Sequence, residues 1–177
     1  NDPSEFHHGL AFAKRLASGI FMDDDYLAPF GFAVRRALDG IDVGDLYVAS
    51  FSEKGDLLSQ WRGYCPAGAG ICLGFELETV RAFCNERGFR LEPCLYEHND
   101  QSRQVIALAN RCFEQFPKPV MGRDEYERLT TGEKLNADFE YRARTSEGPQ
   151  KQQADAATAW LCEAISELAP LFKNEGF

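Results

Sequence analysis

Leu46-Tyr47-Val48-Ala49-Ser50-Phe51 decides which fold the sequence predicts. Aromatic and β-branched residues dominate this stretch, and Gly44 and Gly55 stand on either side of it, which is the pattern of a strand. Residues 70–75 predict a second, buried strand, and residues 89–96 predict a third. Three strands of this kind predict a small mixed sheet.

Helical patterns surround these strands. Apolar residues recur at intervals of three and four over four long segments, residues 4–21, 24–38, 105–116 and 154–171. Two shorter helices are expected over residues 57–64 and 76–87. Several helices around about three strands predict the α+β class.

The 177 residues fit a single domain. The chain starts with a turn-like Asn1-Asp2-Pro3 and stops at the apolar Phe177, so we expect residues 1–177 to be one incomplete domain. Residues 118–153 are polar and rich in charge, and they predict an insertion or a mobile loop.

The charge, the apolar runs and the cysteines of the chain limit the classes of partner and the cellular location that we expect. Lys and Arg number 19 against 28 Asp and Glu, a net charge of −9, so a nucleic-acid backbone would be repelled overall. No apolar run approaches the roughly 20 residues of a membrane helix. The 6 cysteines form no C-x-x-C pair, as is typical of reduced cytosolic thiols. We therefore expect a cytoplasmic protein that binds neither nucleic acid nor membrane.

The first candidate site lies where the first predicted strand ends. Side chains alternate along a strand, so Ser50 and Ser52 place two hydroxyls on one side, next to Glu53. Two hydroxyls at a strand end can hold a ribose or an amide. The alternative is a turn in which Ser52 binds its own backbone amides.

The second candidate site is the helix that follows. Leu57, Trp61 and Tyr64 share one helical face and could stack on a flat ligand, while Arg62 could meet a phosphate or a carboxylate. Such an aromatic stripe is also typical of a protein core. The candidate ligand-binding residues are Ser50, Ser52, Glu53, Trp61, Arg62 and Tyr64.

The sequence contains no motif typical of a metal site or of a hydrolase. His7 and His8 are adjacent, so on a helix they diverge by about 100° and do not converge on one metal ion. His98 has no evident companion, and no Ser-x-x-Lys, G-x-S-x-G or H-E-x-x-H motif occurs. We predict no metal site and assign no catalytic residue.

Three ordered motifs carry a resemblance to a known family. They are Asn1-Asp2-Pro3-x-Glu5, then Ser50-x-Ser52-Glu53 with Trp61 and Tyr64, then Gly70-x-Cys72-x-Gly74-Phe75. Together they resemble a large bacterial family, domain of unknown function 2971, over about the first half of the chain. The resemblance implies further segments at both ends, including an arginine before the N-D-P motif and an E-x-E-x-R-like segment after residue 173.

The order of arginine, Ser-x-Ser and Glu-x-Glu is also similar to that of ADP-ribosyltransferases. This similarity implies NAD as the ligand, with Ser50 and Ser52 bracing the nicotinamide ribose pocket. Phe51 replaces the usual threonine, and the arginine and the catalytic glutamate would lie outside this chain. The Glu-x-Glu at residues 76–78 opens a predicted helix, where acidic residues need no catalytic explanation.

Three functions therefore stay open. The leading hypothesis is a small-ligand pocket with NAD binding like that of the ADP-ribosyltransferases. The second is a non-catalytic binding or sensor module in stress or phage defence, because no complete acid, base and nucleophile set occurs. The third is an interaction scaffold that uses residues 118–153, with its protein partner unidentified.

Overall fold

The computed structural model describes residues 3–41, 46–55, 65 and 70–173, with side chains from Phe6 onward. Within these ranges the chain is helical and contains no β-strand, so the predicted α+β fold with a three-stranded sheet is wrong. The helices are α1 (Pro3–Met22), α2 (Ala28–Asp39), α4 (Leu77–Arg87), α5 (His98–Gln115), α6 (Arg123–Glu127), α7 (Thr131–Ser146), α8 (Lys151–Leu168) and the 3-10 helix η1 (Ala169–Leu171).

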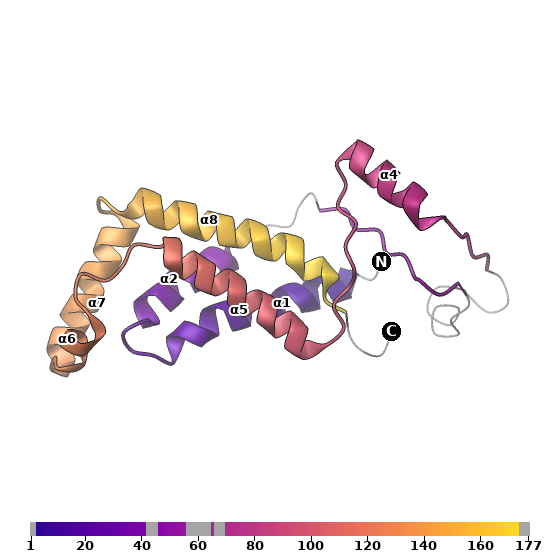
Figure 1. The fold of residues 1–177 in the computed structure, drawn as a ribbon. Helices are drawn as coiled ribbons and strands as arrows, with labels where there is room; N and C mark the ends of the chain where they lie inside the picture. The colour runs from indigo at the N-terminus through magenta and orange to yellow at the C-terminus, as the bar shows by residue number, and fades with distance from the viewer. Residues whose placement is uncertain (1–2, 42–45, 56–64, 66–69, 174–177) are drawn as a thin grey trace.

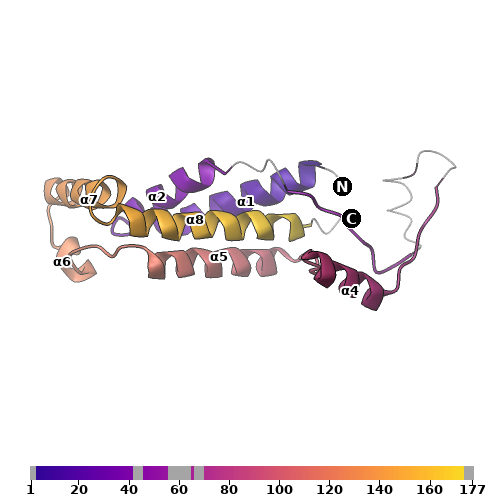
Figure 2. The ribbon, with the colours of Figure 1, turned by 90° about the horizontal axis from the view of Figure 1, so that it is seen from above.

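Helices α1, α2, α5 and α8 form an elongated bundle (Figures 1 and 2). Helix α1 packs against α2 and α5, and α8 packs against α5 and α2. Helix α7 contacts α8 and α2 and lies with α6 at one end of the bundle, while α4 stands apart at the other end. The predicted helices at residues 4–21, 24–38 and 154–171 are confirmed with small shifts.

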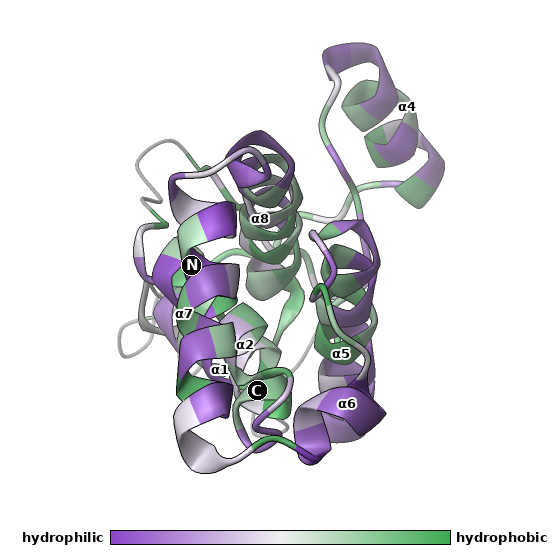
Figure 3. Ribbon diagram, turned by 90° about the vertical axis from the view of Figure 1, so that its left-hand side faces the viewer, coloured by the Kyte–Doolittle hydropathy of each residue, from purple (hydrophilic) through white to green (hydrophobic). Residues whose placement is uncertain are grey.

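The helices form a bundle because the apolar stripe of each helix packs against the apolar stripe of another. Hydropathy colouring shows the green faces of α1, α5 and α8 turned toward one another and the purple faces outward (Figure 3). Phe30 and Phe116 are almost completely buried, and their rings meet edge to face with centroids 4.9 Å apart. Burying each such side chain contributes about 1.5–3 kcal/mol.

Two helix ends follow rules that are readable in the sequence. Pro29 lies in the first turn of α2, where its missing N–H costs no helical hydrogen bond, so α2 starts at Ala28 rather than at Asp24. Gly88 ends α4 with φ 69°, a left-handed conformation that a residue with a Cβ rarely adopts.

The three predicted strands run as extended chain without a strand ladder among the described residues. Residues 46–51 and 70–75 have exposed apolar side chains, and residues 89–96 contribute one parallel bridge, between Leu95 and Phe172. Their composition favours a half-buried pleated surface, but a strand forms only where a second strand pairs with it. Composition alone therefore led to the wrong fold class.

The range 118–153, predicted as an insertion or a mobile loop, contains α6 and α7. Thr130 begins α7 with a capping box, because its side chain accepts from the Glu133 N–H while the Glu133 carboxylate accepts from the Thr130 N–H. Two tyrosines of this range, Tyr126 and Tyr141, are buried.

Candidate functional site

The predicted ligand-binding residues divide into two groups. Ser50, Ser52 and Glu53 are exposed on the extended segment that leaves the bundle after α2. The Ser52 Oγ donates to the Lys54 carbonyl at 3.0 Å and accepts from the Lys54 N–H at 3.2 Å, which is the turn geometry kept open as the alternative. Trp61, Arg62 and Tyr64 lie outside the described residues.

A different set of residues forms a hollow. These residues come from the starts of α1 and α5 and the end of η1, which lie at the same end of the bundle as the extended segment (Figure 1). We call this hollow the basic hollow. It has a volume of about 290 Å³, close to the lower limit for small-molecule sites. Its described lining residues are His8, Gly9, Ala11, Phe12, Arg15, His98, Gln101, Phe172 and Lys173.

The wall that α1 supplies follows from helical spacing. His8, Phe12 and Arg15 are four and three residues apart, so they lie on one helical face. Gly9 lets this face come close to η1, because a Cβ there would lie 2.5 Å from the Ala169 carbonyl oxygen. The small residue at position 9 therefore allows the close approach of α1 to η1.

The opposite wall is fixed by backbone hydrogen bonds. The Leu95 N–H donates to the Leu171 carbonyl at 2.7 Å, and the Lys173 N–H donates to the Leu95 carbonyl at 3.0 Å. The buried Gln101 side chain donates from Nε2 to the carbonyl oxygens of Leu95 at 2.7 Å and Lys173 at 3.0 Å. Gln101 thus ties the start of α5 to the segment after η1.

Aromatic rings line the middle of the basic hollow. Phe12 meets the His98 ring at 4.9 Å between centroids and the Phe172 ring at 5.8 Å, the latter edge to face. His98, which has no evident companion in the sequence, therefore packs with its ring tilted by 56° against a residue 86 positions away. These rings give the hollow an apolar surface suited to a flat group.

The charge of the basic hollow is opposite to that of the protein. Among its described lining residues every ionisable side chain, His8, Arg15, His98 and Lys173, is basic, although the whole chain has a net charge of −9. His8, Arg15 and His98 are exposed, and Lys173 is half-buried. A local basic site on an acidic protein attracts anions to that place in preference to the rest of its surface.

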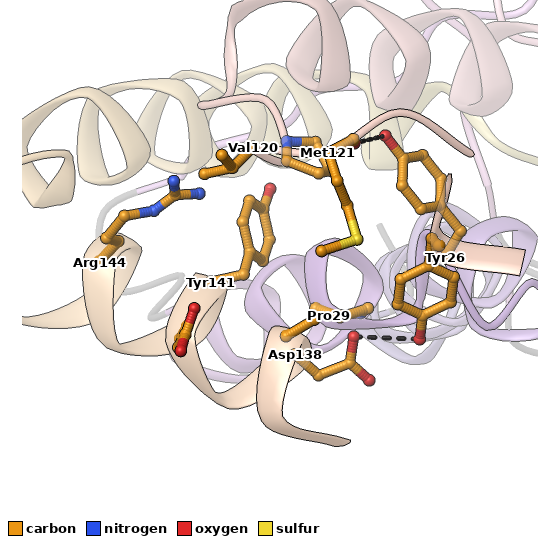
Figure 4. A pocket seen from close by; sticks show the side chains of 11 residues that line it. Tyr26, Pro29, Val120, Met121, Asp138, Tyr141 and Arg144 are labelled. Carbon is orange, nitrogen blue, oxygen red and sulfur yellow. Dashed lines mark hydrogen bonds between the residues drawn. The ribbon is translucent and has the colours of Figure 1, made fainter. Parts of the chain in front are cut away.

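A second hollow lies at the far end of the bundle, between α2, α6 and α7, and three tyrosines dominate it (Figure 4). We call it the tyrosine hollow. Its lining residues are Tyr26, Pro29, Pro119, Val120, Met121, Tyr126, Ala137, Asp138, Glu140, Tyr141 and Arg144.

Each of the three tyrosine hydroxyls has an acceptor within the protein. Tyr26 donates to the Met121 carbonyl at 2.9 Å, Tyr126 donates to Asp138 Oδ1 at 3.1 Å, and Tyr141 donates to the Pro117 carbonyl at 2.7 Å. Figure 4 shows two of these bonds as dashed lines on the side of the hollow away from Arg144. They attach the segment between α5 and α7 to the bundle.

The electrostatics of the tyrosine hollow reflect burial rather than catalysis. Burial, helped by the hydrogen bond to Asp138, raises the pKa of Tyr126 to about 12. Burial also raises the pKa of Asp138, and the donation from Tyr126 opposes that rise. The Arg144 Nε and Nη2 atoms are buried, and no acceptor for them occurs among the described residues. We interpret this hollow as a joint that holds α6 and α7 in place.

In the described ranges no group of three or more His, Cys, Asp or Glu side chains is placed to hold a metal ion. Over the same part of the chain, none of the helices is both long and apolar enough to cross a membrane.

Sequence reasoning missed the basic hollow because its residues come from three distant segments. The one signal within reach was the spacing of His8, Phe12 and Arg15 on a predicted helix, which places two basic residues and one ring on a single face. His98 and Lys173 join them only through the packing of α1 against α5 and η1.

Comparison with known proteins identifies the family. No curated protein and no solved structure matches the chain. The model of one family, described as Protein of unknown function (DUF2971), matches residues 60–177, two thirds of the chain. The match covers the Trp61, Tyr64 and Gly70–Phe75 motifs and extends over the second half, beyond the motifs that carried the resemblance. The chain therefore belongs to the DUF2971 family.

Proposed function

We propose that this protein binds a phosphate-bearing nucleotide, with its phosphate held in the basic hollow. The observation that carries the proposal is the lining of that hollow, to which four basic side chains and two phenylalanine rings contribute in a protein of net charge −9. A nucleotide offers both chemistries that this lining can recognise, an anionic phosphate and a flat base.

Each part of the lining has a role in this proposal. Arg15 offers a planar fork of donors that matches a phosphate, and Lys173 adds a point charge on the opposite wall. The half-buried Phe12 ring, backed by the buried Phe172, offers an apolar surface on which a base can stack, a contact worth about 1–3 kcal/mol per base. The hollow is large enough for a phosphate and part of a nucleoside, with the remainder on the surface.

Among nucleotides, we propose NAD because of the position of two serines. Ser50 and Ser52 lie on an extended segment at the same end of the bundle as the basic hollow (Figures 1 and 2). In this proposal the ribose of a dinucleotide whose phosphates occupy the hollow lies along this segment, and binding it replaces the turn hydrogen bonds between Ser52 and Lys54. An ADP-ribosyltransferase reaction needs a catalytic glutamate as well, and nothing assigns Glu53 that role.

A non-catalytic binding or sensor role is the second candidate. It is favoured by the absence, within the described ranges, of a nucleophile and base in hydrogen-bond contact in the basic hollow. In this role the protein reports the level of a nucleotide and does not consume it. We propose that either role takes place in the cytoplasm, as the cysteine usage predicts.

A thermal-shift panel tests the binding proposal. NAD, ADP-ribose, adenosine and inorganic phosphate are each added to the wild-type protein. Saturation at about 100 times Kd stabilises a protein by about 2.7 kcal/mol, so we expect NAD and ADP-ribose to raise the melting temperature by about 5 °C or more. Adenosine, which lacks phosphate, should have little effect. Equal shifts with adenosine and ADP-ribose, or no shift with any nucleotide, would overturn the proposal.

Nicotinamide release separates the two roles. Incubation with NAD followed by chromatography of the products should detect free nicotinamide if the protein is a transferase. Stabilisation of the full-length protein by NAD without nicotinamide release would favour the sensor role over the transferase.

A further inference from the structure

Gln101 is a buried polar side chain in the first turn of α5, at the edge of the basic hollow. It is 8% exposed and is one of the residues that line the hollow. Because α5 begins at His98, the Gln101 side chain lies next to the segment that enters the helix. Buried polar groups need hydrogen-bond partners, and the partners of Gln101 show what it holds in place.

The Gln101 carboxamide uses its N–H groups on backbone carbonyls. Its Nε2 atom lies 2.7 Å from the Leu95 carbonyl oxygen and 3.0 Å from that of Lys173, which is 72 positions away in the sequence. The Tyr96 carbonyl oxygen is 3.5 Å away. Since an amide nitrogen carries two hydrogens, the two shorter bonds leave none for a ligand. A flipped amide would turn its oxygen toward three carbonyl oxygens, so the orientation is fixed.

These bonds form a closed ring that includes the backbone of Lys173. The Lys173 N–H donates to the Leu95 carbonyl at 3.0 Å, and the Gln101 side chain donates to that carbonyl and to the carbonyl of Lys173. Both backbone polar groups of Lys173 are therefore bonded, the N–H to Leu95 and the carbonyl to Gln101. The ring fixes the Lys173 backbone relative to the start of α5.

The backbone alone holds this segment weakly. Leu95 and Phe172 form an isolated parallel bridge, with one further hydrogen bond from the Leu95 N–H to the Leu171 carbonyl at 2.7 Å. An isolated bridge lacks the neighbouring strands that hold a residue within a sheet. The side chain of Gln101 adds a connection from α5 that the bridge does not supply.

The position of its backbone matters for Lys173 in particular. A lysine carries a point charge at the end of a flexible four-carbon stem, so the place where its backbone is fixed decides which positions the ammonium reaches. Arg15 lies on the α1 wall of the basic hollow, and Lys173 lies on the opposite wall. A cation that is already held near its bound position loses less conformational freedom when an anion arrives.

We propose that Gln101 is a positioning residue of the basic hollow, which holds the Lys173 backbone so that the Lys173 ammonium meets the phosphate of the nucleotide. This inference rests on the proposed nucleotide function and adds a residue that sets the affinity of the same site without donating to the ligand. Replacing Gln101 should therefore weaken nucleotide binding only through Lys173.

A double-mutant cycle, measured by calorimetric titration of ADP-ribose, tests this dependence. Lys173→Met should raise Kd about 10-fold or more, because it removes a charged partner of the phosphate. Gln101→Met keeps a similar side-chain volume and removes both donations, and it should raise Kd about 3-fold to 10-fold. Adding Gln101→Met to Lys173→Met should change Kd by less than about 2-fold. Gln104→Met is the matched control, since Gln104 is exposed on the same helix, and it should bind as the wild type does.

Hydrogen exchange of the Lys173 amide tests the positioning without any ligand. Gln101→Met should speed this exchange by about 5-fold or more relative to the amide of Leu161 in the bundle core, and Gln104→Met should leave it unchanged. Gln101→Asn replaces Gln101→Met if the latter does not fold. Its side chain is one methylene shorter, so it does not reach both carbonyls.

Unchanged Kd in Gln101→Met, effects of Gln101→Met and Lys173→Met that multiply in the double variant, or unchanged exchange of the Lys173 amide would each overturn the inference. A wild type that binds no ADP-ribose would refute the nucleotide proposal, and with it the contact between Lys173 and phosphate. In that case, faster exchange in Gln101→Met would still show that Gln101 positions Lys173.

Discussion

Gly9 of α1 lies so close to Ala169 of η1 that a Cβ at position 9 would stand 2.5 Å from the Ala169 carbonyl oxygen. The same Cβ would be 3.2 Å from the Cβ of Phe172, which lines the basic hollow. Gly9 therefore lets the first helix lie directly against η1, next to a residue that lines the basic hollow. Since the obstructing atom belongs to the backbone, a side chain at position 9 forces the two elements apart.

Gly9→Ala should destabilise the protein. Overpacking of this kind costs about 1–3 kcal/mol, which lowers the melting temperature by about 2–12 °C in a domain of this size. Gly19→Ala is the control on the same helix, because a Cβ at Gly19 meets no atom within 4 Å. That control should gain about 0.5–1 kcal/mol from its higher helix propensity. Equal melting temperatures for the two variants would contradict the close packing of α1 on η1.

Tyr141→Phe should also lower stability. Tyr141 is buried, and its hydroxyl donates to the Pro117 carbonyl at 2.7 Å, so the change leaves a buried acceptor without its donor. The expected cost in the free energy of unfolding is about 1–3 kcal/mol, measured by urea denaturation. Tyr47→Phe is the control, because Tyr47 is 91% exposed and should change stability by less than about 0.5 kcal/mol.

The pair Asp24–Arg123 should make stability depend on pH in the acid range. The Arg123 guanidinium, through its hydrogen bonds to the carboxylate, holds the pKa of Asp24 below its ordinary value. A depressed pKa in the folded state means that the pair stabilises the fold above the unfolded pKa of about 3.9. That contribution is lost as the pH falls through the lower, folded pKa.

Asp24→Asn removes the titrating group and tests this dependence. Between about pH 5 and pH 2 the wild-type melting temperature should fall more steeply than that of the variant. Asp39→Asn serves as the control, because the Asp39–Arg35 pair is exposed and 3.9 Å apart, and its profile should follow the wild type. Parallel profiles for wild type and Asp24→Asn would show that the pair does not matter to the fold.

The helices of the bundle could be predicted because their signal is local. A 3.6-residue apolar repeat and the position of Pro29 are properties of short segments, and the fold preserves them. The strands could not be judged in the same way. Residues 46–51 and 70–75 have the composition of strands, but whether a strand forms depends on a partner that local composition does not specify.

The candidate sites differ in the same way: one follows from local sequence, and the other depends on how distant segments pack. The turn at Ser52 was one of two interpretations of a local pattern, and its hydrogen bonds to Lys54 are present. The basic hollow combines residues from positions 8–15, 98–101 and 172–173, so it arises only when α1 packs against α5 and η1. The family assignment is confirmed by a match over residues 60–177, which leaves the motifs at residues 1–5 and 50–53 outside the matched range.

Calorimetric titration of ADP-ribose into three proteins tests the proposed site most directly. The wild type is compared with Arg15→Gln, which removes the guanidinium that lines the basic hollow, and with Arg36→Gln, which removes an exposed arginine of α2 outside it. A hydrogen bond to a charged partner contributes about 1.5–3 kcal/mol. We expect Kd to rise about 10-fold to 100-fold in Arg15→Gln and to stay within about 2-fold of the wild type in Arg36→Gln. Equal affinity in all three proteins would contradict nucleotide binding at the basic hollow.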